Sequence, residues 1–238
     1  MKKFYLGCSI TMLMLSCTAE NSDFNENEAV NGISALAKTV HNPLPENAGN
    51  PYDITGRLYF DIRNAYSGNS SNSTLEQIAL SVDAIAFENA DFMMLRGSVA
   101  SNVNIELINE VIYNPKGTLE EIIAASSLSI LAQASLTQFI DTVEAIENEE
   151  YDDIYSYIIS YETVILSSNF SEEDSRVLLS TSSIARYELY RKKRPRDRDW
   201  ETSVGNIVAA AGGALDTSAL AIKTSVVTDI GIVNQVIE

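Results

Sequence analysis

From Pro51 onward, the apolar residues of this chain recur at the spacing of an α-helix. Ile54, Leu58 and Ile62 follow one another at intervals of four residues, which places them on one face of a helix. Similar spacing continues along most of the chain up to Leu189, and no stretch shows the clear apolar–polar alternation of a half-buried strand. The spacing predicts an all-α fold, a single bundle of about five to seven helices.

Polar residues mark several expected helix starts. Three pairs have the spacing of a capping box, in which a side chain at the helix start accepts a backbone N–H bond: Ser73 with Glu76, Thr118 with Glu121, and Ser171 with Asp174. The residues after Thr118 are apolar or small on nearly every side until Phe139. We therefore expect a long, central, buried helix there, which would break, if anywhere, at the serines in positions 126, 127 and 129.

The amino-terminus has the anatomy of a secretory signal peptide. Two lysines follow Met1, and the apolar run over residues 4–15 is too short to span a hydrocarbon core of roughly 30 Å. The run ends in "LMLSC", which is similar to a bacterial lipobox, although Met14 and Leu15 depart from its usual residues. We predict signal cleavage after residue 16 and lipidation of Cys17. An ordinary signal peptide and an uncleaved anchor are the alternatives.

The rest of the chain divides into a tether and a helical domain. Residues 17–50 are rich in Asn, Glu, Ser and Ala and end in a proline-rich stretch, which favours a flexible tether. The helical domain is expected over residues 51–238. Within it, residues 192–203 form a basic connector and residues 204–238 are rich in small side chains.

Composition excludes several kinds of chemistry. The chain has 33 acidic and 16 basic residues and a net charge of −17, so overall attraction to nucleic acid or to an anionic bilayer is not expected. The two cysteines, Cys8 and Cys17, leave no disulfide framework for the helical domain. His41 is the single histidine, which excludes a Ser–His–Asp triad and a two-histidine metal centre. We therefore expect no metal and no cofactor.

A cluster of carboxylates and aromatic rings is the one candidate for ligand binding or catalysis. Carboxylates can cleave glycosides or bind sugar hydroxyls, and aromatic rings stack on sugars. The alternative is structural, since acids in a first turn offset the helix dipole and tyrosines at helical spacing pack a core. The candidate residues are Tyr151, Asp152, Asp153, Tyr155, Tyr157 and Tyr161.

A run of cations precedes the small-residue segment. It could bind acidic lipid or glycan ahead of a membrane-inserting helix, in which Gly205, Ala209 and Gly213 would allow close packing. The alternative is that the cations offset the dipole at a helix end and that residues 204–238 form a packed hairpin, because Asp216 interrupts the apolar run. The candidate basic patch consists of Arg191, Lys192, Lys193, Arg194, Arg196 and Arg198.

The "LMLSC" end of the signal, the acidic tail after it, and "NPYDITGRLYFDIRNAY" followed by "STLEQI" resemble secreted lipoproteins of the Bacteroidota. The resemblance covers only the signal and residues 50–85. It implies export to the outer membrane or cell surface through the lipid anchor, and it implies no activity.

These observations favour a lipid-anchored helical protein with a non-catalytic binding or structural role at the cell envelope. Its partners would be the membrane, through the anchor, and an envelope protein or glycan that the sequence leaves unidentified. One alternative is a membrane-active or secreted effector that uses the basic and small-residue segments. A third, an envelope hydrolase that relies on Asp and Glu, would need a pocket to shift a carboxyl pKa.

Overall fold

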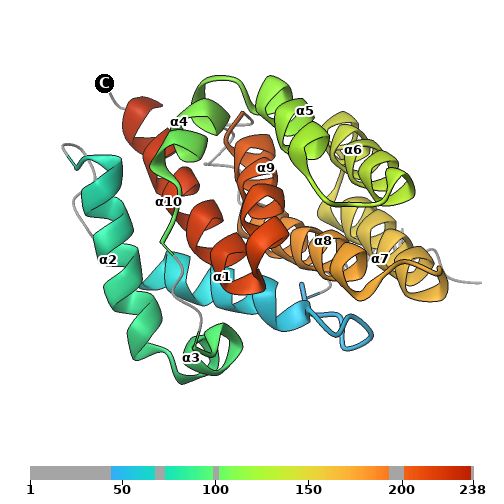
Figure 1. Cartoon of the computed structure of the whole chain (residues 1–238), viewed down its shortest axis with the longest axis horizontal. Helices are drawn as coiled ribbons and strands as arrows, with labels where there is room; N and C mark the ends of the chain where they lie inside the picture. Colours follow the sequence, from blue (N-terminus) through green and yellow to red (C-terminus); the bar gives the residue numbers. More distant parts are fainter. Residues whose placement is uncertain (1–43, 68–72, 99–101, 193–200, 237–238) are drawn as a thin grey trace, which may run out of the picture. The chain divides into compact units, whose positions relative to one another are not determined.

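The computed structural model describes residues 44–67, 73–98, 102–192 and 201–236. Within these residues the chain forms ten α-helices and no strand (Figure 1), so the predicted all-α class is confirmed and the predicted helix count is too low. The helices are α1 (Asp53–Ala65), α2 (Leu75–Glu88), α3 (Ala90–Arg96), α4 (Ile105–Tyr113), α5 (Pro115–Ala125), α6 (Ile130–Ala145), α7 (Tyr151–Ser167), α8 (Glu172–Lys192), α9 (Glu201–Asp216) and α10 (Ser218–Val236).

The expected long helix after Thr118 is two helices, α5 and α6. The chain breaks at the serines, where Ser126 is extended and the Ser129 side chain accepts from the backbone N–H of Ala132 to start α6. The expectation that this stretch is the buried centre is wrong, because Ile130 and Leu131 on α6 are 83% and 74% exposed.

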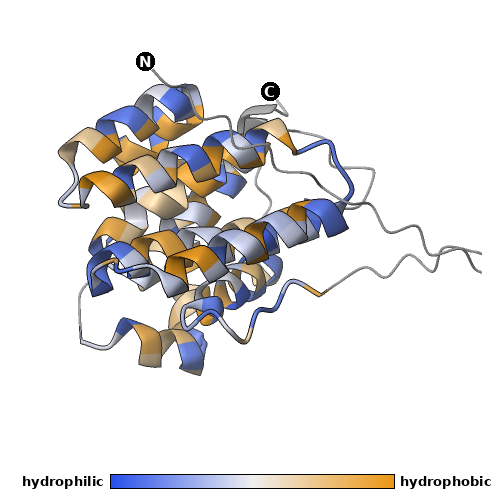
Figure 2. Ribbon diagram, turned by 90° about the vertical axis from the view of Figure 1, so that its right-hand side faces the viewer, coloured by the Kyte–Doolittle hydropathy of each residue, from blue (hydrophilic) through white to orange (hydrophobic). Residues whose placement is uncertain are grey.

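The centre of the described fold is formed by α8, α9 and α10. Every residue of α8 from Val177 to Leu189 is buried, and this helix packs against α1, α6, α7, α9 and α10. In Figure 1, α9 and α10 lie between α2 on one side and α5 and α6 on the other. The surrounding helices are amphipathic, with apolar and hydrophilic residues alternating along each ribbon in Figure 2.

Two of the three helix starts at which we expected a capping box are capped by other residues. At α2 the box is formed one residue later, by Thr74 and Gln77. At α5 the cap is Asn114, which accepts from the backbone N–H of Gly117, so Thr118 lies inside the helix. At α8 the Ser171 hydroxyl does accept from the backbone N–H of Asp174, at 3.0 Å. Capping therefore depends on where the preceding chain enters the helix as well as on residue type.

The small-residue segment is a tightly packed helix pair. α9 and α10 are joined by one residue, Thr217, and their described side chains are almost all buried. Gly213 lies so close to α10 that a Cβ atom there would be 2.6 Å from the Leu220 carbonyl. In the parts of the chain that the structure describes, no helix combines the length and apolar character needed to cross a membrane.

Candidate functional site

Residues 44–50, which the sequence placed in the tether, lie against α7 and α8 and are named here the N-terminal strap. The side-chain amide of Asn50 donates to Glu162 on α7 at 2.8 Å and to the Leu179 carbonyl of α8 at 3.1 Å. The amide of Asn47 donates to the other oxygen of Glu162 at 2.6 Å. The Pro45 carbonyl accepts from the Arg186 guanidinium. The strap is therefore held by side chains that belong to the domain.

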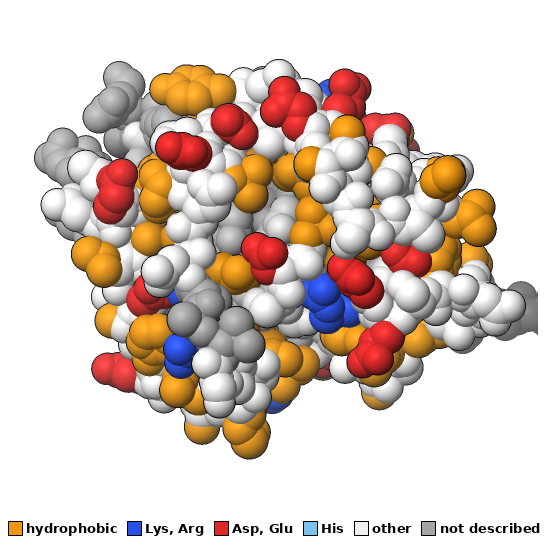
Figure 3. Space-filling view, in the orientation of Figure 1, with side chains coloured by type: hydrophobic (Ala, Val, Ile, Leu, Met, Phe, Trp, Pro, Cys, Tyr) orange, Lys and Arg blue, Asp and Glu red, His pale blue; other side chains and the backbone are white. Residues whose placement is uncertain are grey.

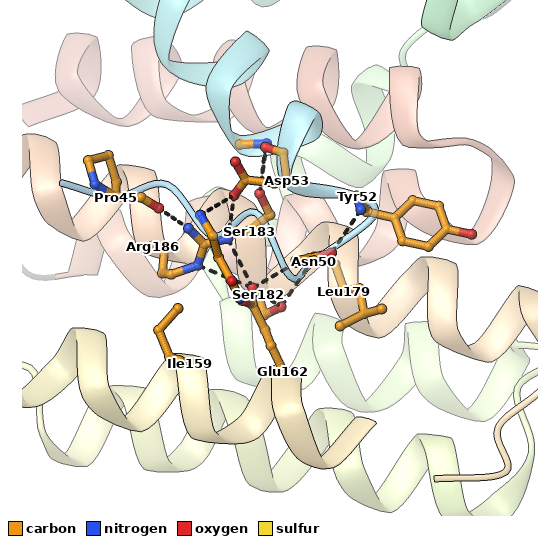
Figure 4. A network of polar contacts seen from close by, with 12 residues as sticks. Pro45, Asn50, Tyr52, Asp53, Ile159, Glu162, Leu179, Ser182, Ser183 and Arg186 are labelled. Carbon is orange, nitrogen blue, oxygen red and sulfur yellow. Dashed lines mark hydrogen bonds and ion pairs between the residues drawn. The ribbon is translucent and has the colours of Figure 1, made fainter. Parts of the chain in front are cut away.

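Arg186 and Glu162 form the buried centre of this contact (Figure 4). Both side chains are 0% exposed, and the guanidinium lies 3.2 Å from the Glu162 carboxylate and 2.6 Å from Asp53 at the start of α1. The Ser182 hydroxyl donates to the same Glu162 oxygen at 2.9 Å. A buried ion pair is stable only when its remaining donors and acceptors are also satisfied, and here the strap supplies several of the partners. We call these residues the strap network: Pro45, Asn47 and Asn50 of the strap with Asp53, Glu162, Ser182 and Arg186.

Electrostatics favour the charged form of the arginine. Burial by itself would lower the pKa of Arg186, but the negative charges of Glu162 and Asp53 outweigh it and raise that pKa above its usual value. Arg186 therefore stays cationic, and its planar group can reach three partners on different elements at once.

A second buried ionic cluster lies where α8, α9, α10 and α1 meet, and we call it the α8–α10 cluster. Arg191 lies 3.0 Å from Glu188 and 2.9 Å from Asp229, and the Asn206 amide donates to both carboxylates. The Tyr59 hydroxyl donates to Glu188 at 2.6 Å. Arg63 pairs with Asp229, and Lys192 lies 3.0 Å from Glu188.

The environment of Glu188 shifts its acidity strongly. Burial would raise the pKa of Glu188, but Lys192, Arg191 and the hydrogen bond from Tyr59 outweigh burial and lower it to about 2. The pKa of Tyr59 is raised well above its usual value by burial and by the charges of Glu188 and Asp229. In this cluster the carboxylates of Glu188 and Asp229 pair with cations from α1 and α8. Such an arrangement is suited to holding helices together.

The structure separates the members of the candidate basic patch. Arg191 and Lys192 belong to the α8–α10 cluster, and their side chains are 19% and 11% exposed. They do not present an open cationic surface. The other four members, Lys193, Arg194, Arg196 and Arg198, lie outside the described residues. Cys17 and His41 also lie outside them.

The candidate carboxylate and tyrosine residues do not form one site. Tyr151 is buried, and its hydroxyl donates to the Arg186 carbonyl at 3.3 Å. Tyr155 reaches the strap, where its hydroxyl donates to the Glu46 carbonyl at 3.0 Å. Tyr157 and Tyr161 stack instead on Phe139 of α6, with ring centroids 6.2 and 4.4 Å away.

The two carboxylates of that candidate set also have different surroundings. Asp153 is exposed, whereas Asp152 is half-buried. Burial raises the pKa of Tyr151 and of Tyr161, so both stay protonated at neutral pH. The tyrosines thus pack α7 against α6, α8 and the N-terminal strap.

A recess of about 100 Å³ lies between α5, α6 and α9, and its lining contains none of the candidate residues that the structure describes. The Lys116–Glu144 ion pair, with its atoms 2.8 Å apart, lies beside the apolar side chains of Val204 and Val208 there. Sites for drug-sized ligands occupy about 300 to 1,000 Å³, so this recess is small by comparison. Among the described residues, no three His, Cys, Asp or Glu side chains are placed to hold a metal ion.

Sequence reasoning missed the residues that form the two ionic groups, although one signal was present. The buried face of α7 consists of Tyr151, Ile154, Ile158, Glu162 and Ile165. A glutamate in line with these isoleucines has to be buried, and a buried carboxylate needs a cation. Which cation serves it could not be read from spacing, because Arg186 belongs to another helix.

No protein family, curated protein or solved structure matches this chain.

Proposed function

We propose that this chain is a lipid-anchored helical domain of the cell envelope with a non-catalytic structural or binding role. The anchor would be Cys17, and the location would be the outer membrane or the cell surface. The observation that carries the proposal is the N-terminal strap, which joins the end of the tether to the domain through the strap network.

The chain just before α1 is held by Arg186, Glu162 and Asp53, all of which belong to the helical domain. The Arg186 guanidinium donates to the Pro45 carbonyl, and Glu162 and Asp53 accept from the side chain and the backbone N–H of Asn47. A hydrogen bond to a charged group is roughly twice as strong as one between neutral groups. A pull on the tether would therefore act on residues 44–50 before it reached α1.

The ionisable groups in the buried centre support a structural role. Glu162 and Arg186 hold the strap, and Glu188 and Asp229 pair with cations from α1 and α8. A catalytic carboxylate needs a pKa near the working pH and access to substrate, whereas Glu188 is buried with a pKa of about 2.

Metabolic labelling with palmitate in a bacterium that processes lipoproteins tests the anchor. We expect label in the full chain, loss of label in Cys17→Ser, and retained label in Cys8→Ser, which changes the same side chain inside the signal. The Cys17→Ser chain should also leave the membrane fraction. Equal labelling of the two variants would overturn the proposal.

The non-catalytic role is tested on the same purified chain. We expect no turnover of a panel of glycoside and peptide substrates, and recovery of a specific envelope protein or glycan in pull-downs from the native organism. Turnover that disappears in Asp152→Asn or Asp153→Asn would favour the hydrolase alternative instead.

A further inference from the structure

The N-terminal strap is attached to the domain by hydrogen bonds rather than by apolar contacts. The hydrophobic core of the described residues contains none of residues 44–50. Leu44 is 62% exposed, and Glu46, Ala48 and Gly49 are exposed as well. The helices are held together by apolar burial, so the strap and the helices depend on different kinds of interaction.

The contacts of the strap converge on two side chains of the domain, Glu162 and Arg186 (Figure 4). One oxygen of the Glu162 carboxylate accepts from the Asn47 amide at 2.6 Å, and the other accepts from the Asn50 amide at 2.8 Å. Arg186 donates to the Pro45 carbonyl. Because one carboxylate binds both asparagines, we expect the contacts of the strap to form and to break together.

The two central side chains keep partners inside the domain that do not depend on the strap. The Arg186 guanidinium lies 3.2 Å from Glu162 and 2.6 Å from Asp53. The Ser182 hydroxyl donates to Glu162 at 2.9 Å. If the strap left, water would replace its hydrogen bonds, and neither charge would stay buried without a partner.

The helix that follows the strap, α1, has its own attachment to α8. The Ser183 hydroxyl donates to the Asp53 carbonyl and accepts from the Gly56 backbone N–H, each at 3.0 Å. A Cβ atom at Gly56 would lie 2.5 Å from the Ser183 carbonyl, so the two helices are in close contact. The strap can therefore leave the domain while α1 stays in place.

We propose that the N-terminal strap is a latch, which opens and closes as a unit while the described helices stay folded. The seven residues 44–50 span up to roughly 25 Å when fully extended, so opening lengthens the chain before α1. Opening also brings the Glu162–Arg186 pair, which is 0% exposed in the closed state, into contact with solvent. A pull on the chain before the strap favours the open state, because that state is longer.

The surface of the domain offers the open strap little ionic attraction. The charged side chain of the strap is Glu46, and in Figure 3 acidic side chains are scattered over the visible face while cations are few. Like charges repel, so Glu46 gains no attachment from the acids on that face. The closed position is therefore selected by the amide–carboxylate contacts of Asn47 and Asn50 with Glu162.

Native-state hydrogen exchange on the full chain tests whether the strap opens separately. The backbone N–H of Asn47 donates to the Asp53 carboxylate at 3.1 Å. Relative to its unfolded rate, it should exchange at least about a hundredfold faster than the N–H of the buried Ile184 on α8. Dilute urea should change exchange little at Asn47 and steeply at Ile184, because global unfolding exposes far more surface. Equal protection and equal urea dependence would overturn the proposal.

Two alanine variants test the contacts that hold the latch closed. Asn50→Ala removes the amide that donates to Glu162 and to the Leu179 carbonyl, so protection of the Asn47 N–H should fall about ten- to hundredfold. Glu46→Ala is the matched control, since the exposed Glu46 contacts Tyr155 through its backbone carbonyl, and its effect should stay within about threefold.

Circular dichroism of the two variants should show unchanged helicity. Equal protection of the Asn47 N–H in Asn50→Ala and in the unmodified chain would contradict the proposal. A loss of helicity in Asn50→Ala would also contradict it, because the helices would then depend on the strap.

Stretching single molecules measures the opening directly. In an unlipidated Cys8→Ser chain, handles are attached at Cys17 and through Val236→Cys. The chain should lengthen by up to roughly 25 Å in a first, reversible step, before the larger step in which the helices unfold. Asn50→Ala should lower the force of the first step, and Glu46→Ala should not. A single unfolding step would overturn the proposal. Because this chain carries no lipid, the result is independent of the labelling test of Cys17.

Discussion

At the scale of single residues, the buried ion pairs of the strap network and of the α8–α10 cluster join the helices. Arg186 connects the strap, α1 and α7 to α8, and Arg191 connects α8 to α10. Removing one partner of a buried pair is costly because the other charge stays buried without compensation. The individual members of these groups should therefore be much more sensitive to substitution than exposed charges on the same helices.

Glu162→Gln should lower the free energy of unfolding by about 3 kcal/mol, because Arg186 would lose its fully buried counter-charge. Asp153→Asn is the matched control on α7, since Asp153 is exposed, and its effect should stay within about 0.5 kcal/mol. Urea denaturation of both variants gives the comparison. Equal effects would show that the strap network does not stabilise the fold.

The lowered pKa of Glu188 predicts how stability depends on acid. A carboxyl group whose folded-state pKa is about 2, against an ordinary value near 4.5, stabilises the fold above pH 4.5, and this contribution disappears as the pH falls toward 2. The contribution is on the order of 3 kcal/mol.

Glu188→Gln should therefore be less stable than the unmodified chain at pH 7, and its stability should change less between pH 4.5 and pH 2. Thermal denaturation across this range measures both effects. A variant that loses stability with acid as steeply as the unmodified chain would assign the acid sensitivity to other carboxylates.

At the scale of elements, the α9–α10 pair depends on small residues for its close contact. Neighbouring glycines on α9 have different surroundings. A Cβ atom at Gly213 would meet the backbone of Leu220 at 2.6 Å, whereas one at Gly212 would meet the side-chain ends of Leu107 and Ile122 at 3.1 and 3.3 Å. Side-chain ends can shift, but the backbone of α10 can shift only if the helix moves.

Gly213→Ala should thus destabilise the fold by about 2 kcal/mol, since the overpacking exceeds what alanine adds in helix propensity. Gly212→Ala should stay within about 1 kcal/mol of the unmodified chain, because the gain in propensity offsets the tighter contact. Chemical denaturation distinguishes them. If the two substitutions had the same effect, the close approach of α9 and α10 would not explain the glycine at position 213.

At the scale of the whole described domain, α9 and α10 are part of the core. Each buried valine or isoleucine of these two helices contributes about 2 kcal/mol through burial of its side chain. These residues are Val204, Ile207, Val208, Ile222, Val226, Val227, Ile230 and Ile232. A membrane-active role for this segment would require both helices to leave the core.

A chain that ends at Lys192 should therefore lose its cooperative thermal unfolding transition, because α8 would expose the surface that it now buries against α9 and α10. A chain that ends at Val236, which lacks only two residues, should keep the transition. Calorimetry of both chains makes the comparison. A cooperative transition in the shorter chain would support a separable C-terminal segment, as the effector alternative expects.

Local patterns in the sequence predicted which segments form helices better than they predicted where those helices lie in the fold. The four-residue spacing of Ile54, Leu58 and Ile62 predicts α1 correctly, and these residues face the core because a helix brings every third or fourth residue to one side. The same rule predicted a central helix after Thr118, because the residues of that stretch are small or apolar on nearly every side, yet Ile130 and Leu131 are exposed. Spacing reports which faces of a helix can be buried, but other helices decide whether they are.

The sequence by itself determined the all-α class, because helical spacing depends on residues close together in the chain. The signal, the lipidation of Cys17 and the tether stay predictions from patterns of the same local kind. Only the tertiary structure decided that α8, α9 and α10 form the centre, and that residues 44–50 belong to the domain. It also paired Glu162 with Arg186 and Arg191 with Asp229. These pairs join residues 24 and 38 positions apart. Their partners are set by helix packing, which follows from the whole core rather than from any local pattern.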